Sequence, residues 1–357
     1  MARSTFAFID RAALAHNLAC VRDWVPGARV MAVVKADAYG HGLTRCLPAF
    51  MDADLLAVAT MDEARAIRAL VPDIPVLLLE GVMSPEELAT ARGLGLEMVV
   101  HHAVQLAWLE QEGRGPGRRV WLKVDSGMHR LGFAPDGAVA AERRLRALPG
   151  VDDVVLMTHF ACADRADHPL NRRQVERFDR ATTSLDGPRC MANSAALLNL
   201  PEARRDWVRT GLLLYGVSPL SGRDGAALGL RPAMTLASRL IAVNDVAAGE
   251  SIGYGARFVA ARDTRIGVAA IGYGDGYPRN MPDGTPVLVN GREQRLAGRV
   301  SMDMTTIDLD GQPEAAVGDP VVLWGDGLPV ERVAAAADTI PYELLCRVTR
   351  RVPYRFR

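Results

Sequence analysis

The chain has 357 residues, enough for two domains, and its 49% hydrophobic and 24% charged residues are typical of a globular protein. Lysine plus arginine equals aspartate plus glutamate at 42 each, and this zero net charge gives no support to nucleic acid or an anionic membrane as a partner. The sequence has no signal-peptide pattern, and no apolar run approaches the roughly 18 residues of a membrane span. Its five cysteines include no Cys-x-x-Cys pair. We therefore expect the chain to be cytoplasmic.

Short β-type runs alternate with helix-type stretches from about residue 29 to residue 210. The predicted strands are Ala28–Lys35, Leu55–Ala59, Pro75–Leu79, Glu97–His101, Val120–Asp125, Val154–Phe160, Arg189–Asn193 and Trp207–Arg209. The predicted helices include Met61–Leu70, Pro85–Leu94, Ala138–Leu148 and Leu170–Leu185, with Thr60 and Ser84 as caps. Eight such strands predict an α/β fold of the TIM-like (β/α)8 barrel type. The alternative is a doubly wound open sheet. That fold would need a glycine-rich phosphate-binding loop after its first strand, and the stretch Gly40-His41-Gly42 lacks the third glycine of such a loop.

Helical patterns nearly vanish after about residue 230, and short β-type runs separated by turn residues take their place. The predicted strands are Met234–Val246, Arg265–Ile271, Thr285–Val289, Glu293–Val300, Met304–Asp308 and Pro320–Trp324, followed by a helix at Val330–Ala337. We therefore predict a barrel domain over residues 1–228 and a C-terminal, mostly-β domain over residues 229–357.

Polar residues stand at the ends of five predicted barrel strands. They are Lys35, Asp125, His159, Asn193 with Ser194, and Arg209. The chemistry of such barrels lies at the C-terminal ends of the strands, whereas chance would scatter polar residues over both ends. The sequence therefore predicts an active site at this rim of the barrel.

Lys35 ends an apolar run and is followed at once by a polar, glycine-containing loop. Burial disfavours the charged form of a lysine, which frees its amine as a nucleophile. Such an amine forms Schiff bases with aldehydes, including pyridoxal phosphate (PLP). Taken alone, the run fits a surface lysine at a strand end equally well.

The stretch Val-Val-Lys35-Ala-Asp-Ala-Tyr39-Gly-His-Gly resembles the PLP-attachment signature of bacterial alanine racemases, and the resemblance covers nearly the whole chain. It implies a PLP-dependent isomerase that interconverts L-alanine and D-alanine by two-base proton transfer on a PLP external aldimine. It also implies that the enzyme either supplies D-alanine for peptidoglycan or breaks it down. No metal site is expected.

The segment around Lys123, Asp125 and Arg130 is the second informative stretch. Lys123 and Asp125 lie two residues apart on one strand and so point to the same face, and a guanidinium at Arg130 suits a carboxylate. A structural network of these three ions is the alternative. The resemblance implies that Arg130 binds the substrate carboxylate and that Lys123 carries a carbamate, which requires an uncharged, buried amine.

The resemblance also assigns residues that bind the cofactor. It implies that His159 stacks on the pyridine ring and that Arg209 faces the ring nitrogen, where its permanent charge keeps that nitrogen unprotonated. A carbanion is then less delocalised, which suppresses side reactions such as transamination. The alternatives are a packed histidine and a surface arginine. The expected phosphate-binding residues, some in the loops after the last two barrel strands, are Tyr39, Asn193, Ser194, Gly211 and Leu212.

Tyr254 lies between two glycines in the β domain, where such a tyrosine more often marks a tight turn than a site. The resemblance implies that Tyr254 is the second catalytic base, working on the L-enantiomer while Lys35 works on the D-enantiomer, with assistance from His159. It places this tyrosine across a head-to-tail homodimer, so that the active site is shared between subunits. Met302 and Asp303 are expected to join the substrate pocket and Tyr273 to narrow its entrance.

Three other functions stay open as alternatives. The first is a broad-specificity amino-acid racemase, but such racemases are commonly exported. The second is a PLP-dependent decarboxylase, but the loops at Tyr254 and Met302 match racemases. The third is a non-catalytic PLP-binding protein, but such proteins resemble the barrel alone and not the β domain. The chain also departs from many racemases at Arg350, where they carry a tyrosine that reaches the phosphate. Tyr354, on the other side of the same motif, is not assigned that role.

Overall fold

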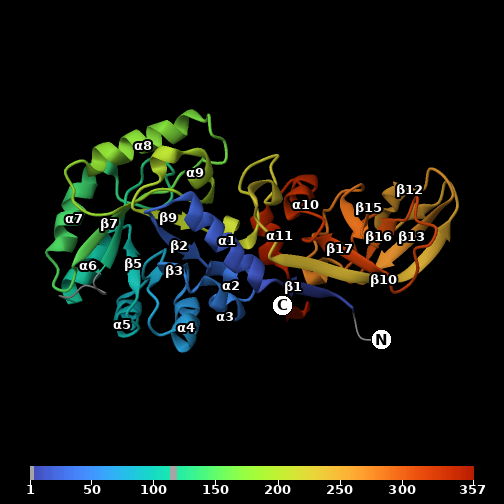
Figure 1. Ribbon diagram of the computed structural model, residues 1–357, viewed down its shortest axis with the longest axis horizontal. Coiled ribbons are helices and arrows are strands. Elements are labelled where there is room, and N and C mark those ends of the chain that lie inside the picture. The colour runs from blue at the N-terminus through green and yellow to red at the C-terminus, as the bar shows by residue number, and fades with distance from the viewer. Residues whose placement is uncertain (1–3, 113–118) are drawn as a thin grey trace.

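The computed structural model describes residues 4–112 and 119–357; residues 1–3, at the start of the predicted barrel domain, and 113–118 lie outside the described residues. A closed parallel barrel with helices around it is joined to a mostly-β domain, which confirms the predicted fold class (Figure 1). Within the described part of the chain, no helix combines the length and apolar character needed to cross a membrane.

The barrel closes in chain order, from β2 round to β9, with all neighbouring strands parallel. Its strands are β2 (Arg29–Val33), β3 (Leu55–Val58), β4 (Val76–Leu78), β5 (Glu97–Val100), β6 (Arg119–Lys123), β7 (Asp153–Met157), β8 (Arg189–Cys190) and β9 (Trp207–Thr210). All eight predicted strands are confirmed, and seven of them end earlier than expected. The polar rim residues therefore mostly stand in the loops just past the strands.

The barrel strands are largely apolar because both of their faces are covered, and their polar residues, such as Glu97, Lys123 and Arg209, lie at or near the strand ends. Every residue of β3 and β4 is buried, as parallel strands beneath a ring of helices require. The rings of Trp121 and Trp207 meet edge to face with centroids 5.2 Å apart, and the Trp121 indole donates to Glu97 at 2.6 Å. These contacts make the barrel a packed core, so ligands reach only its rim.

Helices cover the outside of the barrel (Figure 1). They are α1 (Arg11–Trp24), α4 (Met61–Leu70), α5 (Pro85–Gly93), α6 (Ala103–Glu112), α7 (Ala138–Arg146), α8 (Pro169–Thr182) and α9 (Ser194–Asn199). The Thr60 hydroxyl accepts from the Glu63 backbone N–H at 3.3 Å while the Glu63 carboxylate accepts from the Thr60 N–H, a complete capping box. The Ser84 hydroxyl caps α5 by accepting from the N–H of Glu87, without a complete capping box.

The C-terminal domain is built on one eight-stranded sheet, in the order β13-β16-β15-β14-β17-β10-β1-β18. Its strands are β1 (Phe6–Ile9), β10 (Met234–Val246), β13 (Thr264–Ala269), β14 (Pro286–Val289), β15 (Arg292–Leu296), β16 (Thr305–Asp308), β17 (Pro320–Trp324) and β18 (Tyr354–Phe356). A two-stranded ribbon, β11 (Ser251–Ile252) with β12 (Phe258–Val259), stands apart from it, and two helices follow, α10 (Val330–Ala336) and α11 (Pro341–Arg347).

Both ends of the chain enter this sheet, since β1 pairs with β10 and with β18. The last helix, α11, packs against α2 (Lys35–Gly40), the short element that follows β2 in the barrel. The β domain therefore touches its own barrel directly beside Lys35. The division of the chain between residues 228 and 229 stays a prediction.

Candidate active site

Lys35 follows β2 at the C-terminal rim of the barrel and is half-buried. The next four residues, Ala36 to Tyr39, all have φ between 52° and 54° and ψ between 43° and 52°, which is a left-handed helical turn. Each non-glycine residue in this conformation costs roughly 1–2 kcal/mol. Such strain persists only where the surroundings fix it, so the fold sets the path from Lys35 to Tyr39.

Side chains on both sides of the turn hold it in place. The N–H of Asp37 donates to the Glu63 carboxylate at 3.2 Å. The Nδ1 of His41 lies 3.0 Å from the carbonyl oxygen of Ala38 and 2.9 Å from that of Tyr39, and because both are acceptors, Nδ1 carries the proton. Burial lowers the pKa of His41 to about 4, so this ring stays neutral and keeps its donor in place.

Hydroxyl groups gather where the phosphate of PLP is expected. The Tyr39 hydroxyl lies so close to Gly211 that a Cβ there would clash with it unless the tyrosine moved. The Ser194 hydroxyl accepts from the Gly211 N–H at 2.9 Å and lies 3.4 Å from that of Thr210. Burial raises the pKa of Tyr39 well above its usual range, so it stays a donor.

Asn193 and Leu212 lie beside this group of hydroxyls. The Asn193 side chain accepts from the Ala196 N–H at 2.9 Å and caps α9, which is a structural role. Leu212 opens a short 3-10 helix directly after Gly211 and is fully buried. The structure thus brings the five predicted phosphate-binding residues to one corner of the rim, with the hydroxyls of Tyr39 and Ser194 as the polar groups.

Arg209 is buried, with 5% of its surface exposed, so it is not a surface arginine. Its Nη2 donates to Nδ1 of His159 at 2.7 Å and to the carbonyl oxygen of Thr158 at 3.1 Å, and its Nη1 donates to the sulfur of Cys190 at 3.2 Å. Nδ1 of His159 is therefore an acceptor, and its one proton sits on Nε2. Burial, with the charge of Arg209, lowers the pKa of His159 well below its usual range.

Lys123 is 9% exposed and lines one small hollow together with Arg130 and His159. Burial, followed by the charges of Arg209 and Arg130, lowers the pKa of Lys123 to about 8. Asp125 does not serve as a dedicated counterion, because its Oδ1 accepts the backbone N–H groups of three residues in the loop that carries Arg130, at 2.9–3.0 Å. The charge of Asp125 still acts on Lys123, whose pKa it raises, so the alternative of a Lys–Asp–Arg ion network stays open.

Four cationic side chains influence one another at this rim. They are Lys35, Lys123, Arg130 and Arg209. Lys35 and Lys123 are also the only lysines in the chain, and the fold brings both to one site. A cluster of positive charge is unfavourable until anions enter it, so the arrangement suits a ligand with a phosphate and a carboxylate.

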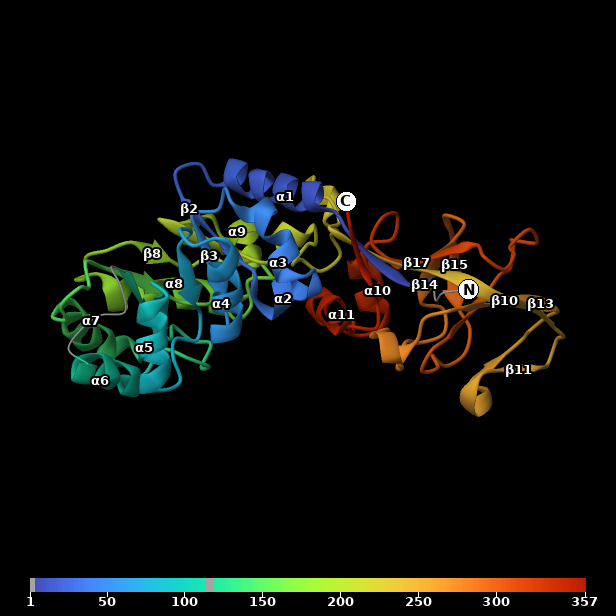
Figure 2. The ribbon, with the colours of Figure 1, turned by 90° about the horizontal axis from the view of Figure 1, so that it is seen from below.

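Tyr254 is not near Lys35 in the same chain. It stands in a short helical turn between β11 and β12, with 64% of its surface exposed. The β11 ribbon projects at the end of the β domain farthest from the barrel (Figure 2). Gly253 and Gly255 take φ of 74° there, which explains the glycines on both sides of this tyrosine. Within one chain, the residue expected to act as the second base therefore lies away from the rim.

Tyr273, Met302 and Asp303 come together in the β domain. The N–H of Tyr273 donates to the carbonyl oxygen of Ser301 at 3.0 Å, and the Asp303 carboxylate pairs with Arg351. Tyr273 and Met302 remain exposed. Arg351 was missed by the sequence analysis, which singled out its neighbour Arg350, an exposed residue. The doublet of arginines gave no signal as to which one pairs with Asp303.

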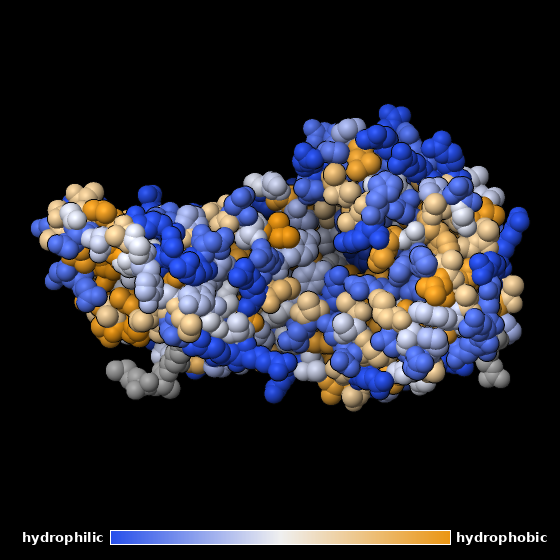
Figure 3. Space-filling model, turned by 180° about the vertical axis from the view of Figure 1, so that it is seen from behind, coloured by the Kyte–Doolittle hydropathy of each residue, from blue (hydrophilic) through white to orange (hydrophobic). Residues whose placement is uncertain are grey.

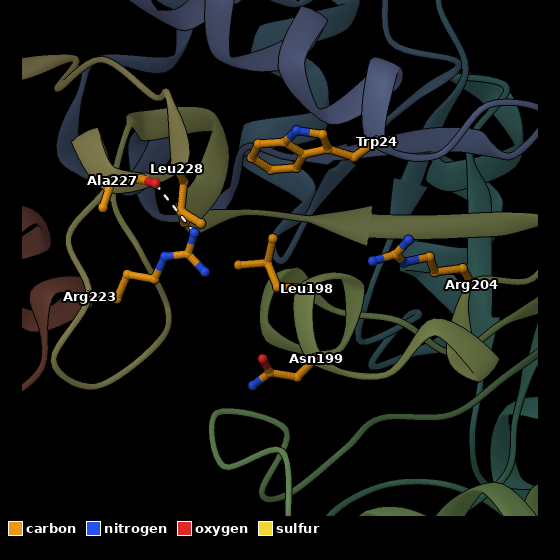
Figure 4. Close-up of a pocket in the computed structure, with 7 residues that line it drawn as sticks. All are labelled: Trp24, Leu198, Asn199, Arg204, Arg223, Ala227 and Leu228. Carbon is orange, nitrogen blue, oxygen red and sulfur yellow. Dashed lines mark hydrogen bonds between the residues drawn. The ribbon is translucent and has the colours of Figure 1, made fainter.

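A separate cavity of about 370 Å³ lies beside the end of α1 and the loop after β9, lined by Trp24, Leu198, Asn199, Arg204, Arg223, Ala227 and Leu228 (Figure 4). Its two arginines are already bonded to backbone carbonyls, Arg204 at 2.8 Å and Arg223 at 3.3 Å. None of the candidate residues lines it. Over residues 4–112 and 119–357, no group of three or more His, Cys, Asp or Glu side chains is placed to hold a metal ion.

Family models match most of the chain. The model described as "Alanine racemase, N-terminal domain" matches residues 9–219, and "Alanine racemase, C-terminal domain" matches residues 233–356. An alanine racemase of Nitrosococcus oceani is 52% identical over 351 residues, covering 97% of this chain and 98% of the relative.

Solved structures agree with the family models. The biosynthetic alanine racemase of Pseudomonas aeruginosa is 50% identical with a TM-score of 0.97, and 99% of each chain is covered. An alanine racemase of Bartonella henselae, described with covalently bound pyridoxal phosphate, is 25% identical with a TM-score of 0.88 over 99% of each chain. Given the rim geometry and these likenesses over nearly its full length, the chain belongs to the alanine racemase family.

Proposed function

We propose that this chain interconverts L-alanine and D-alanine, with PLP attached to Lys35 and with Tyr254 supplied by a second copy of the chain. The observation that carries the proposal is the convergence of Lys35, Arg209, His159 and the Tyr39 hydroxyl at one rim of a barrel that belongs to this family.

The donor set fits PLP. The hydroxyls of Tyr39 and Ser194, next to Gly211, would hold the phosphate, and the Lys35 amine would hold the aldehyde carbon. Arg209 would face the ring nitrogen from its fixed place between His159 and Cys190. When bound, PLP withdraws electrons from the amino acid and makes its Cα proton acidic.

The protein groups around the substrate then have distinct tasks. Arg130 binds the substrate carboxylate and fixes the orientation of Cα. The Lys35 amine holds or returns a proton on one face of Cα, and Tyr254 of the partner subunit does so on the other. The Nε2–H of His159 is free to donate to the phenolic oxygen of that tyrosine, because Nδ1 already accepts from Arg209. Such a hydrogen bond stabilises the oxygen when it is deprotonated.

A head-to-tail homodimer is part of the proposal. Tyr254 and the apolar side chains of Val259, Met302 and Met304 are exposed in the β domain. Hydrophobic residues are visible at the free end of this domain (Figure 3). Burying them on the barrel rim of a second copy would exclude water from the site and bring Tyr254 within reach of the substrate.

We propose that the enzyme works in the cytoplasm. All five cysteines are free, and Cys46 and Cys190 are buried. Unpaired cysteines fit a reducing compartment. Localising a tagged chain by cell fractionation tests this, and recovery with the periplasmic or secreted fraction would contradict it.

A racemisation assay with added PLP tests the main function. We expect alanine to be turned over faster than serine, lysine or arginine. Faster turnover of lysine or arginine would instead favour the broad-specificity racemase. PLP binding without any turnover would favour the non-catalytic PLP-binding protein.

The proposed role in the cell is to supply D-alanine. The Pseudomonas aeruginosa relative is described as biosynthetic, and the present chain covers it almost entirely. Expressing this chain in a strain that requires D-alanine is expected to restore growth without the supplement. Growth that still depends on added D-alanine would contradict the biosynthetic role.

Lys123 is proposed to react with CO2, losing a proton and gaining a carboxylate that pairs with Arg130. The neutral amine is the reactive form, and with a pKa of about 8 it increases as pH rises through this value. After treatment at low pH without CO2, the protein is expected to lose one CO2 in mass and to have weakened substrate binding. Bicarbonate should restore both, faster at pH 8 than at pH 6.

The matched variants separate charge from packing. Lys123→Ala is expected to raise KM for alanine about 10- to 100-fold, because Arg130 loses its buried partner. Lys123→Glu supplies a permanent carboxylate and should recover part of this loss without bicarbonate. An unchanged mass and unchanged KM after the CO2-free treatment would count against the carbamate.

A further inference from the structure

We propose that Tyr354, in the last strand of the chain, is a positioning residue for the PLP-attachment lysine. Its hydroxyl donates a hydrogen bond to the carbonyl oxygen of Gly40 at 2.6 Å, across a separation of 314 residues in the sequence. Gly40 directly follows the left-handed turn from Ala36 to Tyr39. This inference rests on the proposed function of Lys35 and Tyr39, and it assigns Tyr354 no contact with the substrate.

The C-terminal segment encloses Gly40 closely. The carbonyl of Leu345, in α11, lies against the Gly40 backbone so tightly that a side chain at Gly40 would clash with it. The Tyr354 ring lies 3.4 Å from where a Cβ of Gly42 would stand, and β18 holds it in place through its pairing with β1. The end of the turn is therefore fixed against the β domain of the same chain.

The hydroxyl of Tyr354 is suited to hold this carbonyl. The ring is partly buried, and burial raises its pKa to about 12, so the hydroxyl keeps its proton and donates at any pH at which the enzyme works. The carbonyls of Ala38 and Tyr39, the two residues just before Gly40, accept from His41 within the loop itself. Tyr354 therefore holds the carbonyl that directly follows the two carbonyls held by His41.

A shift at Gly40 would reach both ends of the turn. Lys35 opens the element α2 and Gly40 ends it, so the two residues are part of one strained unit. Tyr39, the neighbour of Gly40, places its hydroxyl directly against Gly211 in the proposed phosphate corner. The Tyr342 ring, from the same C-terminal segment, lies 5.8 Å from the Tyr39 ring. Misplacing a site by about 1 Å has large effects on binding and rate, so one hydrogen bond here matters.

The test compares Tyr354→Phe with Tyr277→Phe. Both variants lose one phenolic oxygen, but the buried Tyr277 hydroxyl has no hydrogen-bond partner among the described residues and lies in the β domain. For Tyr354→Phe we expect PLP to dissociate from the protein about five to ten times more readily and kcat to fall by a similar factor. KM for alanine should stay within about twofold. The melting temperature of the PLP-free protein should stay within about 2 °C, and Tyr277→Phe should match the wild type in all four measurements.

Two results would overturn the inference. One is wild-type PLP affinity and kcat in Tyr354→Phe. The other is a parallel loss of melting temperature and activity in both variants, which would mean general destabilisation rather than positioning. A wild-type chain that neither binds PLP nor racemises alanine would instead contradict the proposed function, so the two failures are distinguishable.

Discussion

Lys35→Ala is expected to abolish covalent PLP attachment and to lower racemisation by at least about a thousandfold. The residue would serve twice, as the amine that holds the cofactor and as the base on one face of Cα, and losing an essential nucleophile or base typically costs this much. The measurement is the rate of D-alanine formation together with the absorbance of bound PLP.

The composition of the chain makes this experiment unusually clear. Lys35 and Lys123 are its only lysines, so reduction with borohydride in the presence of PLP can label only these two side chains or the N-terminal amine. We expect the label on Lys35 in the wild type and in Lys123→Ala, and none on Lys123 in Lys35→Ala.

A small amine added to Lys35→Ala serves as the control for folding. The hydroxyls of Tyr39 and Ser194 remain, so the variant should still bind PLP without a covalent bond. Methylamine should then restore part of the racemisation. Near wild-type turnover in Lys35→Ala without an added amine, or a label on Lys123, would contradict the assignment.

The barrel could be predicted from the sequence because its strands are largely apolar and several of its helices begin at clear caps. Thr60 and Ser84 marked two helix starts that the structure reproduces to the residue. The strands β1 and β18 were not predicted, since they are short and their partners lie at the opposite end of the chain. Such pairing depends on tertiary contacts that no local pattern reports.

The site was less predictable than the fold, for physical reasons. From the sequence, Asp125 was expected to pair with the charge of Lys123. In the structure, its carboxylate accepts hydrogen bonds from the backbone of its own loop. The position of Asp125 before Ser-Gly could have indicated this role. The left-handed turn after Lys35 contains alanine twice, which runs against local preference, and only long-range contacts stabilise it. The positions of Arg351 and Tyr354 depend on the way the last segment crosses the barrel rim.

Tyr254→Phe is expected to lower alanine racemisation about 10²- to 10⁴-fold, the usual contribution of a catalytic acid or base. Phenylalanine keeps the ring and its packing and removes only the hydroxyl. The PLP absorbance should not change, because the proposed cofactor-binding residues all lie in the barrel domain. Stopped turnover with retained covalent attachment of PLP would separate Tyr254 from Lys35, because loss of Lys35 removes both turnover and the absorbance of covalently attached PLP.

Mixing the two inactive variants tests whether the active site is shared. In a dimer of one Lys35→Ala chain and one Tyr254→Phe chain, one site carries both substitutions and the other carries neither. Equal mixing makes about half of the dimers mixed, each with one intact site of two, so about a quarter of the wild-type activity should return.

A site contained within one chain would give no such recovery, because every chain in the mixture has lost one of its two bases. Activity no higher than the sum of the separate variants, in a preparation shown to contain mixed dimers, would contradict the shared site. Tyr254 is exposed, and the ribbon that carries it, β11 with β12, projects from the β domain away from the barrel of its own chain, which favours recovery (Figure 2). The control mixes Tyr254→Phe chains with chains that carry both Tyr254→Phe and Lys35→Ala. No chain in this mixture has a Tyr254 hydroxyl. If the mixture stays inactive, the activity that returns in the first experiment depends on the Tyr254 hydroxyl of the Lys35→Ala partner.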